Sequence, residues 1–333
     1  MTRTRTLTWL ALPALAILCA AAVPVLAQSQ VLVSDQHENK VVRYEWPSGQ
    51  PIDHFVADGI SPLDLATEMT VGPDGNLYVA SSASDSVMRY DGRTGQFREA
   101  FVPAGSGGLA RPRGPTFGPD GNLYVSSENT DRVLRYDGRT GVFIDTFVAA
   151  RSGGLHRPSG LAFGPDGNLY VAGKVSNTVL RYDGQSGQII DAVVGDGEAG
   201  LSGPEGLLFD DGGTLYIASQ LSDSVIIVPS GGAAQILVPP GAGGLVGPLD
   251  LALAPDGQTL LVTEVPLGGR VLKFDRNTGA FRGIFVESFA GGISRPVGIL
   301  FLPDPCPADL NDDGTLDVID FFQFIVFFAA GCP

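Results

Sequence analysis

An all-β fold, a six-bladed β-propeller, is predicted by a stretch that returns at a fixed spacing. Residues 72–79 read Gly-Pro-Asp-Gly-Asn-Leu-Tyr-Val, and the same stretch returns at 118–125 and 164–171. Successive copies are 46 residues apart, from Gly72 to Gly118 and from Gly118 to Gly164. Turn residues followed by alternating apolar residues, with a period in the forties, are typical of propeller blades.

Each repeat is expected to hold four short strands. The Gly-Pro-Asp-Gly turn joins the first two strands, and a second Asp-Gly turn follows the third, because Asp-Gly readily supplies the positive φ of a tight turn. The second strand alternates apolar and polar residues with the two-residue period of a half-buried strand. In the third repeat the expected strands are 115–117, 122–126, 132–136 and 142–148.

The number of second strands predicts six blades, and the two ends of the repeat region predict how they close. The first copy lacks an inner strand, whereas an extra one, Val297–Phe301, ends the repeats after an Arg-Pro dipeptide. We expect Val297–Phe301 to complete the first blade and close the ring, which leaves no open sheet edge at the junction. The second strands are expected at 31–33, 76–80, 122–126, 168–172, 214–218 and 259–263.

Residues 1–27 have the pattern of a secretory signal peptide. Arg3 and Arg5 precede an apolar run, Trp9–Val25, and small residues end the segment before Gln28. A membrane anchor is the alternative, but a run of about 17 residues is at the short limit for a span. We therefore expect a chain exported to the cell surface or the medium, with no transmembrane span after cleavage.

The charge of the chain excludes some classes of partner. Two of the 21 basic residues lie in the signal segment, which leaves 19 against 36 acidic residues and a net charge of −17. Nucleic acids and anionic membranes are bound through basic faces, so neither is an expected partner. The acidity itself is explained by solubility outside the cell.

Residues 28–304 resemble the NHL-repeat and streptogramin-lyase-like group of six-bladed propellers. The resemblance depends on Gly-Pro-Asp-Gly-Asn-Leu-Tyr-Val, on Arg-Tyr-Asp-Gly at 89–92, 135–138 and 181–184, and on Arg-Pro-x-Gly before the inner strand. It implies the architecture. In the enzymes of this group it implies a histidine with a metal-holding acid in the central channel, or a calcium ion there. Neither set can be matched, because His37, His54 and His156 occupy three different repeat positions.

Departures from the repeat give the candidate site residues. Gly114, Gly160 and Gly298 share a position at the start of the inner strand, where the second and sixth blades have Glu68 and Asp250. Inner strands line the channel, so these carboxylates could bind a hard cation or act as acid and base. The alternative is that they are solvated loop acids. Further candidates are Glu205, one residue earlier in the fifth blade, His156 at the channel mouth, and Glu128 and Glu264 after two second strands.

The C-terminal segment, 305–333, contains a calcium-loop pattern of the EF-hand type. Gly314 stands at the sixth position of the loop Asp309–Asp320, where a sharp turn is needed, and oxygen ligands stand at the alternating positions. Four carboxylates would offset the lost hydration of Ca²⁺. The predicted ligands are Asp309, Asn311, Asp313, the Thr315 carbonyl, Asp317 and Asp320.

This loop resembles dockerin repeats, because Asp stands at its last position and no clear helix precedes it. Dockerins of cellulosomes have two such repeats and this chain has one, which leaves a cohesin-like partner open. Cys-Pro-Ala-Asp-Leu-Asn-x-Asp-Gly followed by a Phe-rich helix, here Val318–Ala330, resembles C-terminal segments of exported planctomycete-type proteins. That resemblance implies sorting or attachment. Cys306 and Cys332 bracket the segment and suggest a disulfide, with free thiols as the alternative.

The sequence therefore predicts a secreted or cell-surface propeller that binds a protein or glycan ligand and carries a calcium-binding attachment segment. The alternatives are a metal-dependent lyase or lactonase, and a component of a polysaccharide-degrading assembly. Geometry discriminates between them: Glu68, Glu205 and Asp250 converging on one point in the channel would favour the enzyme.

Overall fold

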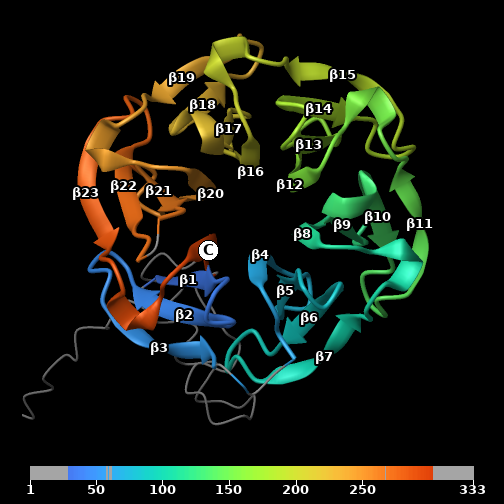
Figure 1. Ribbon diagram of the computed structural model, residues 1–333, viewed down its shortest axis with the longest axis horizontal. Coiled ribbons are helices and arrows are strands. Elements are labelled where there is room, and N and C mark those ends of the chain that lie inside the picture. The colour runs from blue at the N-terminus through green and yellow to red at the C-terminus, as the bar shows by residue number, and fades with distance from the viewer. Residues whose placement is uncertain (1–28, 58, 60–61, 267, 303–333) are drawn as a thin grey trace, which may run out of the picture.

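The computed structural model describes residues 29–302, except for residues 58, 60–61 and 267. Within these residues the chain forms six four-stranded sheets arranged as blades around a central axis (Figure 1). The all-β, six-bladed propeller predicted from the repeats is confirmed. The signal segment, the calcium loop, the helix expected at Val318–Ala330 and both mature cysteines lie outside the described residues.

The chain passes through each of blades 2 to 6 from the inner strand to the outer strand, with antiparallel neighbours. Blade 2 is β4 (Ala66–Val71), β5 (Leu77–Ser81), β6 (Ser86–Tyr90) and β7 (Phe97–Val102). Blade 3 is β8 (Pro112–Phe117), β9 (Leu123–Ser127), β10 (Arg132–Tyr136) and β11 (Phe143–Val148). Blade 4 is β12 (Pro158–Phe163), β13 (Leu169–Gly173), β14 (Thr178–Tyr182) and β15 (Ile189–Val194). Blade 5 is β16 (Pro204–Phe209), β17 (Leu215–Ser219), β18 (Ser224–Val228) and β19 (Gln235–Val238). Blade 6 is β20 (Pro248–Leu253), β21 (Thr259–Glu264), β22 (Val271–Asp275) and β23 (Phe281–Val286).

Blade 1 joins the two ends of the repeat region. Its inner strand is β24 (Pro296–Phe301), followed outward by β1 (Gln30–Asp35), β2 (Lys40–Glu45) and β3 (Pro51–Val56). Val33 pairs with Ile299 and Val31 with Phe301, and the Leu302 N–H donates to the Gln30 carbonyl at 2.9 Å. The predicted closure by the last strand is confirmed.

The inner strands are longer than the sequence pattern predicts. In blade 3 the strand begins at Pro112 and not at residue 115, with a shift of register between Pro112 and Pro115. Two prolines in this stretch argue against a strand interior, which is why the pattern missed it. An inner strand has a ladder partner on one side only, so it tolerates proline where a central strand would not.

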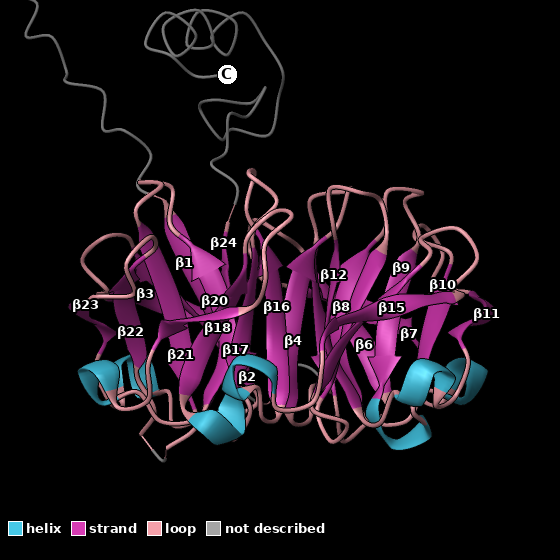
Figure 2. Cartoon of the chain, turned by 90° about the horizontal axis from the view of Figure 1, so that it is seen from above, coloured by secondary structure: helices cyan, strands magenta, loops and turns pink. Residues whose placement is uncertain are grey.

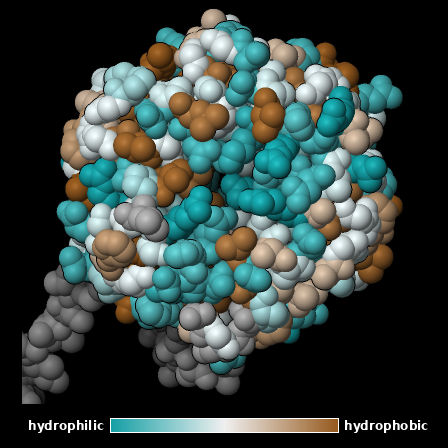
Figure 3. All heavy atoms as spheres, viewed as in Figure 1, coloured by the Kyte–Doolittle hydropathy of each residue, from teal (hydrophilic) through white to brown (hydrophobic). Residues whose placement is uncertain are grey.

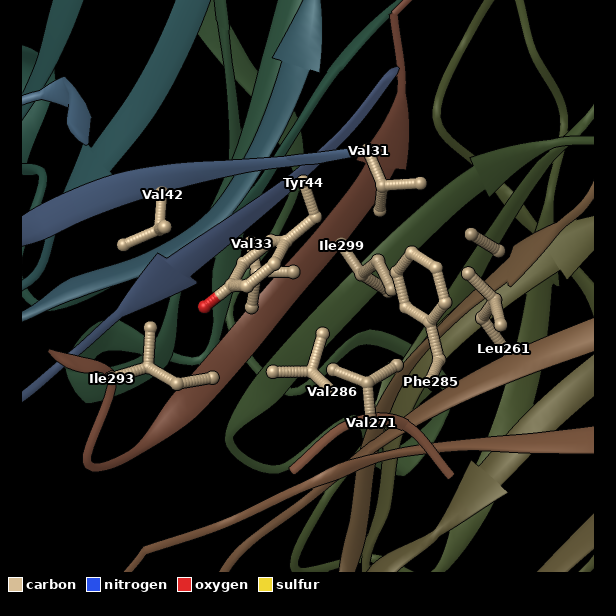
Figure 4. Packing of buried hydrophobic residues seen from close by; sticks show 11 residues of the cluster. Val31, Val33, Val42, Tyr44, Leu261, Val271, Phe285, Val286, Ile293 and Ile299 are labelled. Atoms are coloured by element: carbon tan, nitrogen blue, oxygen red, sulfur yellow. The ribbon is translucent and has the colours of Figure 1, made fainter. Parts of the chain in front are cut away.

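The core lies between neighbouring blades. At the closing junction, side chains of β1 and β2 face those of blade 6 (Figure 4). Trp46 covers this cluster, with its ring centroid 5.4 Å from that of Phe285 and 5.5 Å from that of Phe301. Each fully buried aliphatic or aromatic side chain contributes roughly 1.5–3 kcal/mol. The labelled members of the cluster are Val31, Val33, Val42, Tyr44, Leu261, Val271, Phe285, Val286, Ile293 and Ile299.

Short 3-10 turns lie along one edge of the ring (Figure 2), and we call this side the η face. Most precede an inner strand, as η1 (Ser106–Gly108), η3 (Ser152–Gly154), η4 (Glu198–Gly200), η6 (Ala242–Gly244) and η7 (Ala290–Gly292) do. Two follow a second strand, η2 (Glu128–Thr130) and η5 (Gln220–Ser222). Among the described residues, no helix has the length and apolar character needed to cross a membrane.

Candidate functional site

The third residue of each inner strand forms a narrow ring around the channel. A Cβ added to Gly160 would lie 2.4 Å from the Glu205 carbonyl oxygen, and one added to Gly298 would lie 2.9 Å from the Thr67 carbonyl oxygen. Neighbouring inner strands therefore approach so closely that this position favours glycine. The ring consists of Glu68, Gly114, Gly160, Gly206, Asp250 and Gly298.

The two acids of the ring occupy the space above neighbouring glycines. Glu68 Oε2 lies 2.6 Å from the position that a Cβ of Gly114 would take, and Asp250 Oδ1 lies 2.5 Å from that of Gly206. Larger residues at Gly114 and Gly206 would collide with these carboxylates. The acids and the glycines thus form one interlocked set.

Glu205 is the centre of a buried charge cluster. Its carboxylate accepts hydrogen bonds from Ser159 and Lys174, and Arg113 Nη2 lies 3.1 Å from Oε2. Glu205 is 0% exposed and Arg113 is 6% exposed. Burial alone would raise the pKa of Glu205, but the charges of Arg113 and Lys174 outweigh burial and lower it. Glu205 is therefore ionised, and both of its oxygens are occupied.

Glu68, unlike Glu205, is held in its uncharged, protonated form. Burial raises the pKa of Glu68 to about 8, with Arg113 opposing the rise and Asp250 and Glu205 adding to it. The Ser159 hydroxyl is 3.5 Å from Glu68 Oε1, at the limit of a hydrogen bond. Glu68 is thus largely protonated at neutral pH.

The pKa of Asp250 is also raised, but its carboxylate accepts more hydrogen bonds than that of Glu68 does. Its Oδ2 accepts the Ile299 N–H at 3.0 Å and its Oδ1 accepts the Leu251 N–H at 2.9 Å. Burial raises the pKa of Asp250 to about 7, while these two amides oppose the rise. Asp250 therefore anchors blade 6 to the closing strand β24 in addition to facing the channel.

Glu68 and Asp250 line a channel cavity of about 770 Å³. Its walls include apolar side chains such as Leu161, Phe209 and Ile299. This volume is in the range of small-ligand sites, which are mostly apolar with a few polar groups. Viewed along the axis, hydrophilic residues gather around the centre of the ring (Figure 3).

The structure brings Glu68, Glu205 and Asp250 to the channel, as the sequence suggested, but it does not make them a common ligand set. Among residues 29–302 as described, no three or more His, Cys, Asp or Glu side chains are placed to hold a metal ion. Glu205 is already engaged by cations of the chain itself. The described residues therefore do not fit a channel metal.

The three histidines stand apart from this cluster. His37 is exposed between β1 and β2, and His54 lies on the outer strand β3 with Nε2 3.1 Å from the Gly291 carbonyl oxygen. His156 lies before β12, and its Nε2 is 4.0 Å from Asp131 Oδ1. None of the three is in the inner ring.

The two acids predicted after second strands are buried and paired. Arg111 Nε lies 2.9 Å from Glu128 Oε2. Arg270 Nε lies 2.5 Å from Glu264 Oε1. Both carboxylates thus fix the loops that carry them.

Sequence reasoning missed the partners of Glu205. Arg113 and Ser159 stand at the same repeat position as Glu205, at intervals of 46 residues, and Lys174 stands 46 residues after Glu128. Arg113 and Lys174 depart from the repeat in the same way as the acids, so their repeat positions identify them as well.

Solved structures of similar fold include propellers with different roles. A chain of a nidogen/laminin complex shares 18% identity at a TM-score of 0.66, over 84% of this chain and all 100% of that one. Virginiamycin B lyase from Staphylococcus aureus shares 16% identity at 0.53, over 76% of this chain and 82% of that one. A protein of unknown function from Bacteroides caccae shares 14% identity at 0.58, over 83% and 99%.

The chain is a six-bladed propeller with the architecture of virginiamycin B lyase. No family model matches the sequence, and no curated protein matches it in sequence. At these levels of identity the likeness concerns the fold, because one fold carries many activities.

Proposed function

We propose that this propeller is an exported binding or scaffold protein, held in place by its C-terminal calcium-binding segment. The observation that carries the proposal is the state of Glu205, whose two oxygens are occupied by Lys174, Arg113 and Ser159. A carboxylate bound in this way is available neither as a metal ligand nor as a base. The inner ring then serves as a fixed floor, and the two mouths of the channel serve as binding surfaces.

The similar fold of a chain in the nidogen/laminin complex supports a protein partner. That propeller belongs to an assembly of proteins, which is consistent with binding through a rigid ring. A glycan is the other ligand class that the sequence leaves open. A cohesin-like partner for the C-terminal segment would place the chain in a polysaccharide-degrading assembly.

The attachment segment is proposed to bind Ca²⁺ through the oxygen side chains of its loop. Alternating positions direct one side of such a loop toward the ion, with a backbone carbonyl at the seventh position. Export would follow from cleavage before Gln28. The proposed ligands are Asp309, Asn311, Asp313, Thr315, Asp317 and Asp320.

Calorimetry on the intact secreted chain tests the segment. Wild-type protein should take up calcium with an enthalpy that Asp309→Ala abolishes, while the unfolding of the propeller stays unchanged. The matched control is Asp196→Ala, which removes an exposed acid of the propeller. Equal calcium uptake by wild type and Asp309→Ala would contradict the proposed site.

A second candidate, an enzyme of the lyase or lactonase kind, is favoured by Glu68 and Asp250. Both face the channel cavity, and burial raises their pKa values to about 8 and about 7. A carboxyl group that keeps its proton near neutral pH can serve as a general acid. A lactone and lyase screen with wild type and Glu68→Gln tests this candidate, and turnover that the variant loses would favour the enzyme over the scaffold.

A further inference from the structure

The η face carries exposed cations, although the chain as a whole has a net charge of −15. Arg111 and Arg157 each stand just before an inner strand, β8 and β12, and Arg151 lies in the turn between blades 3 and 4. Their side chains are 47%, 50% and 71% exposed. Basic residues therefore cluster on one arc of this face, over two neighbouring blades.

The acids that pair with these cations lie deeper than the cations do. Arg111 Nε is 2.9 Å, Arg157 Nη1 3.9 Å and Arg113 Nε 4.0 Å from the carboxylate of Glu128, whose side chain is 5% exposed. Three guanidinium groups thus share one buried carboxylate. Arg111 and Arg157 contact Glu128 on their buried side, and these ion pairs include no acid on the solvent side of either guanidinium.

The charge balance of the arc is positive. Five cations, Arg111, Arg113, Arg151, Arg157 and Lys174, share the carboxylates of Glu128, Asp131 and Glu205. Asp85 adds a fourth carboxylate, since it accepts the Arg111 backbone N–H at 2.7 Å. Glu68 also faces Arg113 and brings the carboxyl groups to five, but burial raises its pKa to about 8, so it adds little negative charge at neutral pH. Arg113 Nε is buried without a hydrogen-bond partner. The guanidinium groups lie nearer the solvent than the carboxylates do, so the exposed positive charge attracts an anionic group to this surface.

The backbone holds the two exposed arginines at positions where glycine is favoured. Arg111 has φ 56° and Arg157 has φ 52°, both left-handed. The equivalent residues of blades 5 and 6 are Gly203 and Gly247, and that of blade 2 is Leu65. A non-glycine residue in this region costs of order 1 kcal/mol or more. Leu65 has φ 51° at the same repeat position, so the conformation belongs to the repeat and the arginine side chains are the feature of blades 3 and 4.

An aliphatic arc continues from the cationic arc around the same mouth. Val175 follows Lys174 directly in the loop after β13, Leu221 lies in η5 of blade 5, and Val246 lies in the loop before β20 of blade 6, all on the η face. These three side chains are 47%, 68% and 48% exposed. Hydrogen bonds fix the loops: the Val175 N–H donates to the His156 carbonyl at 3.2 Å and the Leu221 N–H to the Ser202 carbonyl at 3.0 Å.

We infer that the η-face mouth binds an acidic segment of a partner protein, with its carboxylates on Arg111 and Arg157 and its aliphatic side chains on Val175, Leu221 and Val246. The inference rests on the proposed binding function and names the surface and the partner chemistry. A guanidinium fork matches a carboxylate in geometry. The apolar part of the mouth is aliphatic, which suits burial of a partner's aliphatic side chains.

The test measures binding of fluorescein-labelled peptides to the intact chain by anisotropy. A short peptide of alternating Glu and Leu should bind, more weakly at high salt, while the same peptide with Lys in place of Glu should not. The double variant Arg111→Gln/Arg157→Gln should raise the Kd about tenfold or more. Leu221→Asp should do the same, and it removes no buried partner because Leu221 is 68% exposed.

Controls lie on the opposite side of the ring. Arg139→Gln changes an exposed arginine in the turn after β10, and Val142→Asp changes an apolar side chain that is 63% exposed. Both should bind the Glu-Leu peptide as wild type does. Equal binding by the mouth variants, or equal binding of the Lys peptide, would overturn the surface assignment.

A third probe, an oligogalacturonate, separates the partner classes. Tighter binding of this acidic sugar than of the peptide would overturn a protein partner at this mouth. A ligand that binds wild type and the mouth variants equally well would refute the assignment of the mouth. The proposed scaffold function would then still hold. Failure of the scaffold function itself would appear instead as turnover that Glu68→Gln abolishes.

Discussion

Two sets of ion pairs in this propeller have the same chemistry and different surroundings. On the outer strands an arginine of the third strand pairs with an acid of the fourth in blades 1 to 4, and the acids are 43–51% exposed: Arg43–Asp53, Arg89–Glu99, Arg135–Asp145 and Arg181–Asp191. At the channel, Arg113 and Lys174 pair with Glu205, whose side chain is 1% exposed. The outer pairs repeat with the blades, whereas the inner cluster occurs once.

The difference teaches how to tell construction from function in a repeat protein. An exposed pair contributes about 0–1 kcal/mol, so its repetition reflects how a blade is built. A buried pair costs several kcal/mol of desolvation per ion, so its presence is weak evidence that it stabilises the fold. An unrepeated buried cluster therefore points to a role for the channel that the blades themselves do not need.

The largest loss of stability is expected from a substitution that breaks the inner cluster. Glu205→Ala leaves Arg113 buried without its main counter-charge, so the free energy of unfolding should fall by about 3–5 kcal/mol. Urea unfolding monitored by circular dichroism measures the loss. A loss below about 1 kcal/mol would mean that Arg113 finds another partner and that the cluster is no more than a surface pair in energy.

An intermediate effect comes from the neutral acid beside that cluster. Burial raises the pKa of Glu68 from its ordinary value of 4.5 to about 8. The folded protein therefore holds a proton that the unfolded chain releases, and the contribution of Glu68 to stability is greatest below pH 4.5 and declines as the pH rises toward 8. Glu68→Gln should remove this decline and make the protein more stable than wild type at pH 9, where wild type has lost the contribution of the protonated Glu68. Parallel stability-against-pH curves for the two proteins would show that Glu68 is ionised in the fold.

The smallest loss of stability is expected from a substitution that breaks an outer ion pair. Asp191→Ala removes an acid that is 47% exposed from Arg181, which still has Asp166 within 3.2 Å. The free energy of unfolding should fall by about 0.2–1 kcal/mol, and added salt should shrink the difference. A loss as large as that of Glu205→Ala would erase the distinction between the two sets.

The repeats made much of this fold predictable. Three copies of one turn located the blades, and the unmatched strand at Val297–Phe301 revealed the closure, because turn chemistry and alternation are local properties of sequence. The start of β8 at Pro112 was not predictable in this way, since its extended shape is imposed by pairing with β9. Glu68 and Asp250 could be found as departures from a glycine position. Their protonation could not, because it depends on Arg113 and Glu205, which other blades supply.

The closure has a consequence for how the ring would be displayed. Leu302 and Gln30 are hydrogen-bonded neighbours, and β24 runs from the η-face side toward the opposite side of the ring. Strand β24 therefore ends at the back of the disc, on the side opposite the η face. A propeller tethered at that side would present Arg111, Arg157 and Leu221 to the solvent on the opposite face, where a partner could reach them.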